Sequence, residues 1–199
     1  MPAVENVKSL LWQGGAYRAG SGPRTVGLGD SITAGHHLPG TRLAARDSYF
    51  DVLAKRGSIR PLLNAGARGE ESHEIAQRLS AVLELRPDVL VILAGTNDVK
   101  NRKDSASAIA TVEAMHARAE ATGATVLVGL IPPMNVRLTE VADYNDRLRA
   151  TRLALIDFWG PLAAHDGRWL PGLSKDGIHP NARGASFMAD AAQEALARL

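Results

Sequence analysis

The stretch V-G-L-G-D-S-I-T-A-G at positions 26–35 decides how the rest of the chain is interpreted. Its apolar first part is typical of a buried parallel strand, and glycines at positions 29 and 35 flank the turn that follows. A strand that ends in such a turn would expose the hydroxyl group of Ser31. This serine is therefore a candidate nucleophile, provided that the fold brings a base to it.

A candidate base lies far downstream, in the stretch D-G-I-H-P at positions 176–180. Imidazole titrates in the range needed to take a proton from a hydroxyl group, so His179 is the candidate general base. Asp176 precedes it by three residues, and on a turn its carboxylate could hold the imidazole in one tautomer. Pro180 restricts His179 to extended backbone, which predicts that the histidine lies just before the last helix. Ser31, His179 and Asp176 form the predicted triad.

Short apolar runs recur along the chain and alternate with longer segments of helical period. This alternation is typical of an α/β sandwich in which helices cover both faces of a parallel sheet. The expected strands cover residues 25–28, 61–64, 89–93, 125–131 and 153–158.

Three segments have the apolar spacing of a helix that buries one side. One helix is predicted over 75–83, a second over 109–119 with Gly123 ending it, and a third over 181–199 with Asn181 as its N-cap. The third helix is expected to pack on the sheet. The apolar positions are Ile75, Leu79, Val82 and Leu83, then Ile109, Val112, Met115 and Ala119, then Phe187, Met188, Ala191, Ala195 and Leu196.

Composition sets broad limits on the class of protein. With 199 residues, 45% of them hydrophobic, the chain is expected to form one domain over residues 1–199, and the role of residues 1–23 is left open. Lys and Arg total 23 against 21 for Asp and Glu, so a formal charge of +2 gives little attraction for nucleic acid or anionic lipid. Neither a nucleic-acid partner nor stable membrane association is expected.

The chain contains no cysteine, which excludes disulfides, thiolate metal sites and cysteine nucleophiles. Residues 1–20 have only a short apolar patch, and this lacks the apolar core of a signal peptide. No run of apolar residues is long enough to span a membrane. A cytoplasmic location is therefore the expectation.

Parallel strands place the loops that follow them at one edge of the sheet, where ligands usually bind. At this edge a serine site needs hydrogen-bond donors for the negatively charged oxygen of its tetrahedral intermediate. Three donors are candidates, namely the backbone N–H groups of Ser31 and Gly66 and the side-chain amide of Asn97.

With these motifs in place, the chain resembles the SGNH hydrolases, the family of GDSL-type esterases and lipases. Four blocks match in order from about residue 24 onward: Gly29-Asp30-Ser31-Ile32, Asn64 to Gly69, Gly95-Thr96-Asn97-Asp98, and Asp176-x-x-His179. The resemblance implies a flavodoxin-like three-layer α/β/α fold with five parallel strands. It also implies ester hydrolysis without a metal or a cofactor, with Ser31 as nucleophile, His179 and Asp176 as base and orienting group, and Ser31, Gly66 and Asn97 as oxyanion donors.

Other motifs have competing interpretations. Gly27-x-Gly29 lacks the third glycine of a dinucleotide site, and His73-Glu74 lacks the second histidine of a zinc helix. Asp30 and Asp98 could form a carboxylate pair for glycoside hydrolysis, but loop anchoring is favoured for both, as it is for Asp157.

Two sets of residues bear on the substrate. His36 and His37 follow the serine turn and could contact substrate or solvent. The segments 132–135 and 159–175 are expected to form pocket walls, in which Met134, Trp169, Leu170 and Leu173 either hold an acyl group or pack beneath a loop.

The function predicted from the sequence is cleavage of small-molecule carboxylic esters through an acyl-serine intermediate. Within this class, O-deacetylation of a carbohydrate or small metabolite competes with cleavage of lysophospholipids, thioesters or other long acyl esters, and with acyl transfer to an alcohol. A flavodoxin-like binding module is the non-enzymatic alternative. The sequence does not indicate an oligomeric state.

Overall fold

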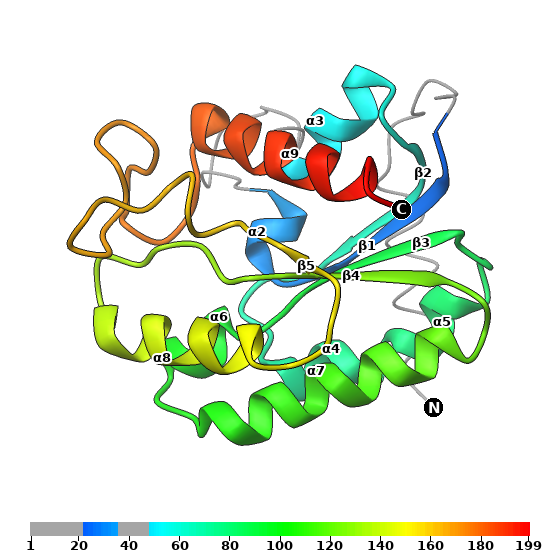
Figure 1. The fold of residues 1–199 in the computed structure, drawn as a ribbon, viewed down its shortest axis with the longest axis horizontal. Helices are drawn as coiled ribbons and strands as arrows, with labels where there is room; N and C mark the ends of the chain where they lie inside the picture. The colour runs from blue at the N-terminus through cyan, green and yellow to red at the C-terminus, as the bar shows by residue number, and fades with distance from the viewer. Residues whose placement is uncertain (1–21, 36–47) are drawn as a thin grey trace.

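Five parallel strands form one sheet in the order β2-β1-β3-β4-β5 (Figure 1). The computed structural model describes residues 22–35 and 48–199. The strands are β1 (Arg24–Gly29), β2 (Arg60–Gly66), β3 (Val89–Leu93), β4 (Thr125–Gly129) and β5 (Leu155–Ile156). This order is the flavodoxin-like one, so the predicted α/β sandwich with a five-stranded parallel sheet is confirmed.

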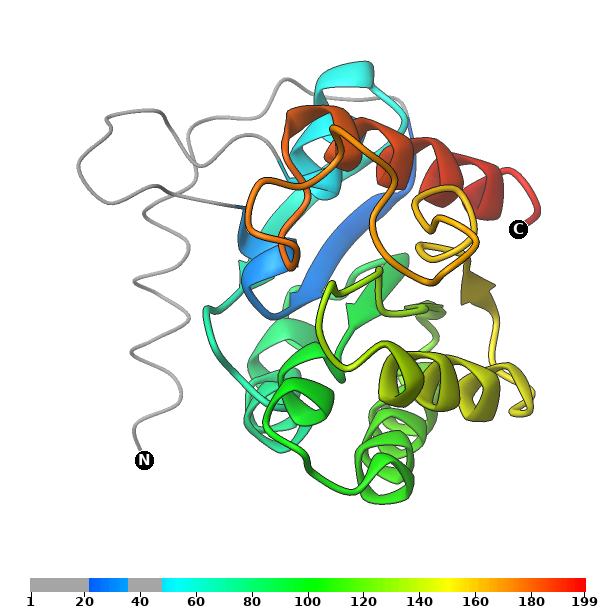
Figure 2. The same cartoon turned by 90° about the vertical axis from the view of Figure 1, so that its left-hand side faces the viewer.

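Helices cover both faces of the sheet (Figures 1 and 2). One face carries α3 (Tyr49–Arg56) and α9 (Ala182–Leu196), and the other carries α4 (Ser72–Gln77), α5 (Leu79–Leu83), α7 (Ser105–Glu120) and α8 (Leu138–Arg149). Two short helices, α2 (Ser31–Ala34) and α6 (Thr96–Lys100), follow the carboxyl ends of β1 and β3. None of the helices in the described ranges is long and apolar enough to cross a lipid bilayer.

The central strands are apolar because both of their faces are covered. Every residue of β3 is buried, as are the last five residues of β1. The register pairs Gly29 at the end of β1 with Gly66 of β2 and with Leu93 of β3. The residues that follow these three strands therefore meet at one edge of the sheet, on either side of the point where the strand order reverses.

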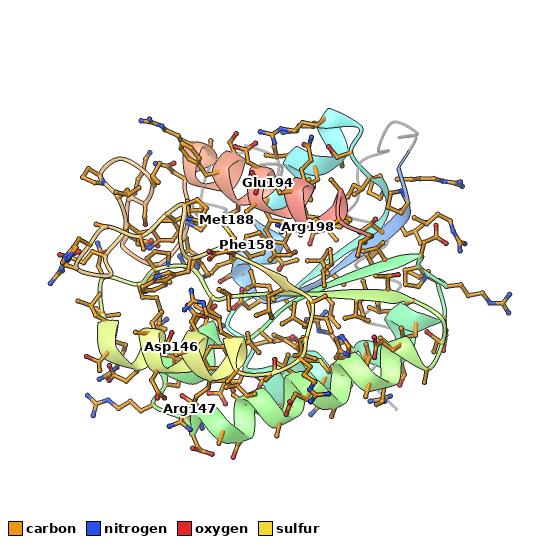
Figure 3. The ribbon with its side chains drawn as sticks, in the orientation of Figure 1. Asp146, Arg147, Phe158, Met188, Glu194 and Arg198 are labelled. Carbon is orange, nitrogen blue, oxygen red and sulfur yellow. The ribbon has the colours of Figure 1, made fainter. Side chains whose placement is uncertain are left out.

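The C-terminal helix packs on the sheet as predicted, except that Phe187, placed on its apolar side, is exposed. Asn181 is its N-cap and accepts the N–H groups of Arg183 and Gly184, both at 3.0 Å. Met188 points into the layer between α9 and the sheet near Phe158, and both side chains are fully buried (Figure 3). Arg56 of α3 donates to Asp190 at 2.6 Å, which joins the two helices on this face.

Several boundaries differ from the sequence prediction. The helix predicted over 75–83 is two helices, α4 and α5, which are separated by Arg78. The strands predicted over 125–131 and 153–158 end at Gly129 and Ile156, because the chain then bends into the loops at the sheet edge. Residues 1–21 and 36–47, which include His36 and His37, lie outside the described residues.

Candidate active site

Ser31 and His179 are neighbours in the fold although 148 positions separate them. Ser31 begins α2, directly after β1, and its Oγ lies 2.9 Å from Nε2 of His179. On the other side of the imidazole ring, Nδ1 lies 2.7 Å from Oδ2 of Asp176. The three side chains that the sequence analysis singles out thus form a continuous row of hydrogen-bonding groups.

The loop that carries Asp176 holds this carboxylate in place. Its Oδ1 accepts the backbone N–H groups of Ile178 at 2.9 Å and His179 at 2.8 Å. Partial burial raises the pKa of Asp176, but these hydrogen bonds, the bond from the imidazole and the charge of His179 outweigh burial and hold the pKa well below its usual range. Asp176 is therefore ionised at neutral pH, and Pro180 keeps His179 outside α9, as predicted.

Asp30 lies directly beneath the serine turn and is fully buried. Its Oδ1 caps α2 by accepting the N–H of Ile32 at 2.8 Å. Burial raises the pKa of Asp30 to about 6, although the N–H of Ile32, the hydroxyl group of Thr96 and the charge of His179 each lower it. Oδ2 of Asp30 and Oγ1 of Thr96 are both buried, and neither makes a well-formed hydrogen bond.

Asp98 is also buried, and both of its carboxylate oxygens are engaged. They accept the backbone N–H of Ser72 at 2.8 Å and its hydroxyl group at 2.7 Å, so Asp98 joins α6 to the start of α4. Asp157 in turn accepts the N–H groups of Trp159 at 3.0 Å and Gly160 at 2.8 Å. Asp30, Asp98 and Asp157 thus each anchor a turn or loop through hydrogen bonds, as predicted.

Asn97 stands at the start of α6, after Gly95, which has a φ of +111° and leaves no space for a side chain beside Tyr144. Its Nδ2 donates to the backbone carbonyl of Glu70 at 2.9 Å. Since a carbonyl oxygen can only accept, this bond fixes which end of the side chain is the amide nitrogen and leaves the second N–H available. The backbone N–H of Ser31 donates to none of the described residues.

The structure gives Gly66 a different explanation from the predicted one. Its N–H donates to Oδ1 of Asn64 at 3.1 Å, so this donor is already engaged. A side chain at position 66 would collide with the backbone of Ala34 in α2, which explains why glycine is needed there. Within the described residues, the N–H of Gly69 has no acceptor, and this residue precedes Glu70, which contacts Asn97.

The predicted pocket walls are joined to the histidine loop. Asn135 donates its N–H to the carbonyl of Gly177 at 2.7 Å and accepts the N–H of Trp169 at 3.1 Å. Met134, Trp169 and Leu173 are buried in the core, and only Leu170 is substantially exposed. Three of the four apolar wall residues therefore pack beneath the loops and are not free to line an open acyl pocket.

Arg78 was not expected at the site. Its guanidinium group is buried and donates to the carbonyls of Ala65 at 2.6 Å and Gly29 at 3.0 Å, and to Oε2 of Glu70 from both Nε, at 2.9 Å, and Nη2, at 2.6 Å. The sequence contains one signal of this, because an arginine three residues after Ile75 falls on the apolar side of the predicted helix.

In residues 22–35 and 48–199, no three His, Asp or Glu side chains gather closely enough to hold a metal ion. His73 is exposed and lies 3.6 Å from Glu71 on the surface.

A family model described as the GDSL-like lipase/acylhydrolase family matches residues 28–186 of the chain. No curated protein sequence matches the chain.

Solved structures show the same fold. A protein from Desulfitobacterium hafniense assigned to the G-D-S-L lipolytic family has a TM-score of 0.76 at 23% identity, with 87% of this chain and 99% of that chain covered. A GDSL-like lipase from Bacteroides thetaiotaomicron has a TM-score of 0.74 at 21% identity, with coverages of 98% and 95%. Axe2, an acetylxylan esterase from Geobacillus stearothermophilus, has a TM-score of 0.70 at 19% identity, with coverages of 89% and 95%.

Proposed function

The chain belongs to the GDSL-like lipase/acylhydrolase family, and on this basis we propose that it hydrolyses carboxylic esters through an acyl intermediate on Ser31. The observation that carries this proposal is the row of contacts from Oγ of Ser31 to Nε2 of His179 at 2.9 Å and from Nδ1 of His179 to Asp176 at 2.7 Å. Such a row is what a hydroxyl group needs to become a nucleophile near neutral pH.

In the first half of the proposed reaction, Oγ of Ser31 attacks the ester carbonyl carbon while Nε2 of His179 takes the hydroxyl proton. The tetrahedral intermediate then collapses, the bond to the alkoxy group breaks, and His179 returns the proton to the departing alcohol. In the second half, His179 takes a proton from water as the water oxygen attacks the acyl carbon. The second tetrahedral intermediate then collapses, the bond between the acyl carbon and Oγ breaks, and His179 returns the proton to Oγ of Ser31 as the acid departs. Asp176, which is ionised, stabilises the imidazolium that forms in each half.

The oxyanion requires donors that are free to point at it. We assign two of these roles to the N–H of Ser31 and the second N–H of Asn97 Nδ2, because neither donates to another described residue. For the third donor we propose the N–H of Gly69 in place of that of Gly66, since Asn64 already accepts the latter. Each such donor is worth about a hundredfold to a thousandfold in turnover.

The structure favours a short acyl group. Met134, Trp169 and Leu173, which could have lined an apolar channel, are buried in packing. An acetyl group needs no such channel, and one neighbour in fold is an acetylxylan esterase. We therefore favour O-deacetylation of a carbohydrate or small metabolite over cleavage of lysophospholipids or long-chain thioesters. A series of p-nitrophenyl esters of increasing chain length tests this, and kcat/KM should fall beyond the shortest members.

The experiment that tests the proposed nucleophile is Ser31→Ala, assayed on p-nitrophenyl acetate. Loss of the nucleophile should lower kcat by several orders of magnitude while the circular dichroism spectrum and unfolding midpoint stay close to those of the wild type. An organophosphonate should label the wild type at one serine and leave Ser31→Ala unlabelled. Near-normal hydrolysis by this variant would contradict the proposal, and an unreactive Ser31 would favour a binding module.

Acyl transfer is distinguished from hydrolysis in the same assay. Added alcohol should leave the yield of free acid unchanged if water is the preferred acceptor, and should divert acyl groups into a new ester if it is not.

A further inference from the structure

Arg78 lies between α4 and α5, and its guanidinium group is buried under the carboxyl edge of the sheet. Its acceptors belong to three segments outside those helices: Gly29 at the end of β1, Ala65 in β2 and Glu70 in the following loop. Only a planar group with several N–H donors can satisfy acceptors in these directions at once, so lysine could not replace it fully.

The acceptors divide into a rigid set and a movable one. The carbonyls of Gly29 and Ala65 belong to two strands that pair with each other, β1 inside the sheet and β2 at its edge, and this pairing fixes their positions. Glu70 belongs to the loop between β2 and α4, and its side chain is less buried than that of Arg78, with 23% against 8% exposed. Arg78 therefore holds Glu70 at a set distance from the ends of the strands.

The other end of Glu70 contacts the site. Its backbone carbonyl accepts Nδ2 of Asn97 at 2.9 Å, the contact that orients this amide. We propose that Arg78 is a positioning residue that, through Glu70, sets where the free N–H of Asn97 points relative to Ser31. This inference rests on the proposed oxyanion role of Asn97.

The size of the effect follows from the contacts that would remain without Arg78. Asp98 still joins α6 to Ser72 at the start of α4, so removal of Arg78 would displace the loop and leave it attached. A donor displaced by a fraction of an ångström loses part of its contribution, which for a whole oxyanion donor is about a hundredfold to a thousandfold. We expect kcat of Arg78→Met to fall by about tenfold to a hundredfold, with KM changed less than about twofold.

The test compares single and double variants of the full chain. Arg78→Met removes the donors, Arg78→Lys keeps the charge, and Glu70→Gln keeps an acceptor for Arg78 but removes the carboxylate charge. Arg24→Met is the matched control, because Arg24 also donates to a carboxylate, Asp88, but at the opposite end of β1. Asn97→Ala is made alone and together with Arg78→Met.

The assay measures kcat and KM on p-nitrophenyl acetate, the pH profile of kcat, and the rate of phosphonylation of Ser31. Arg78→Met should lower kcat and the phosphonylation rate in parallel and leave the pH profile unchanged. Arg78→Lys should lose less of both rates than Arg78→Met does. In the Asn97→Ala background, Arg78→Met should cost less than about threefold, because the group through which Arg78 acts is absent. Arg24→Met should keep kcat within about twofold of the wild type.

Two results would overturn the inference. One is an unchanged kcat in folded Arg78→Met. If that variant does not fold, the corresponding result is an unchanged kcat in both folded Glu70→Gln and folded Arg78→Lys. The other is a loss that is equally large with and without Asn97. Ser31→Ala in the same assay separates this failure from failure of the proposed function, since an active Ser31→Ala contradicts the mechanism itself and an inactive one leaves it intact.

Discussion

An arginine paired with a carboxylate lies at each end of β1, and the two pairs differ in their burial and in their number of acceptors. At the amino end, Arg24 donates to Asp88 with a shortest distance of 2.8 Å, and 40% and 47% of the two side chains are exposed. At the carboxyl end, Arg78 donates to Glu70 at 2.6 Å and also to two backbone carbonyls, with 8% and 23% exposed. The first pair joins two strand ends in water, whereas the second joins buried segments beside the serine.

The aspartates at these ends differ in the same way. Asp88 is exposed, and hydrogen bonds from Arg24 hold its pKa below the usual value, so this carboxylate is ionised at neutral pH. Burial raises the pKa of Asp30 to about 6, because ionisation of this carboxyl group away from water costs free energy. The ion pair at the amino end is exposed to solvent, while Asp30, Asp98 and Arg78 at the carboxyl end are buried and held in fixed positions by hydrogen bonds. This contrast is what a reaction site at the carboxyl end would produce.

The largest expected effect comes from replacing a carboxylate with an amide at each end. Asp176→Asn should lower kcat by about a thousandfold to ten-thousandfold, because a neutral amide can present the wrong group to Nδ1 of His179 and cannot stabilise the imidazolium. Asp88→Asn makes the same chemical change at the amino end and should leave kcat within about twofold. Steady-state hydrolysis of p-nitrophenyl acetate by the two purified variants measures both effects.

Equal losses in these two variants would show that the ends of the sheet do not differ in function. Unchanged activity in Asp176→Asn would remove this residue from the proposed triad while leaving Ser31 and His179 to be tested separately.

Much of the carboxyl end could be predicted from the sequence because its parts are local. Alternating apolar runs identify the strands, and a glycine-flanked turn after one of them places Ser31 at the edge. Pro180 and Asn181 set where α9 begins, and hence where His179 stands. Each of these signals depends on a few neighbouring residues, and parallel topology then brings the separate loops together.

Arg78 and Gly66 show what sequence reasoning could not supply. The apolar period around Arg78 predicts one continuous helix, yet its side chain reaches acceptors 49 and 13 positions away, which no local pattern encodes. Gly66 is explained by the close approach of α2, a contact that depends on how far the helix lies from β2. Both are properties of packed segments that are remote in sequence, and the pKa of Asp30 depends on burial in the same way.

A smaller effect is expected in the pH dependence of stability. Because the pKa of Asp30 is raised from 3.8 to about 6, the stability that Asp30 contributes is full below about pH 4 and is lost as the pH rises through 6. Asp30→Asn keeps an acceptor for the N–H of Ile32 and cannot ionise. Between about pH 4 and pH 8, the wild type should therefore lose about 2 to 3 kcal/mol more of its unfolding free energy than Asp30→Asn does, measured by urea titration.

The amino end supplies the control for this measurement, with the opposite sign. The pKa of Asp88 is lowered, so the stability that Asp88 contributes is present above its ordinary pKa and is lost as the pH falls. Asp88→Asn should therefore be less stable than the wild type at neutral pH and approach its stability as the pH falls, whereas Asp30→Asn should gain stability relative to the wild type as the pH rises. Parallel behaviour of the two variants would show that burial does not distinguish the two ends.

The smallest effect is expected from Arg24→Met, and it depends on salt. Since Arg24 and Asp88 are exposed, mobile ions screen their attraction, and the Debye length falls to about 3 Å in 1 M salt. The variant should unfold at a slightly lower urea concentration than the wild type in dilute buffer and at the same concentration in 1 M NaCl, with unchanged activity in both. Glu70→Gln should unfold at a lower urea concentration than the wild type by the same amount in dilute buffer and in 1 M NaCl, because ions do not reach the buried guanidinium group of Arg78. If the two variants responded to salt alike, burial could not be the reason that one pair only joins strands while the other fixes the geometry of the site.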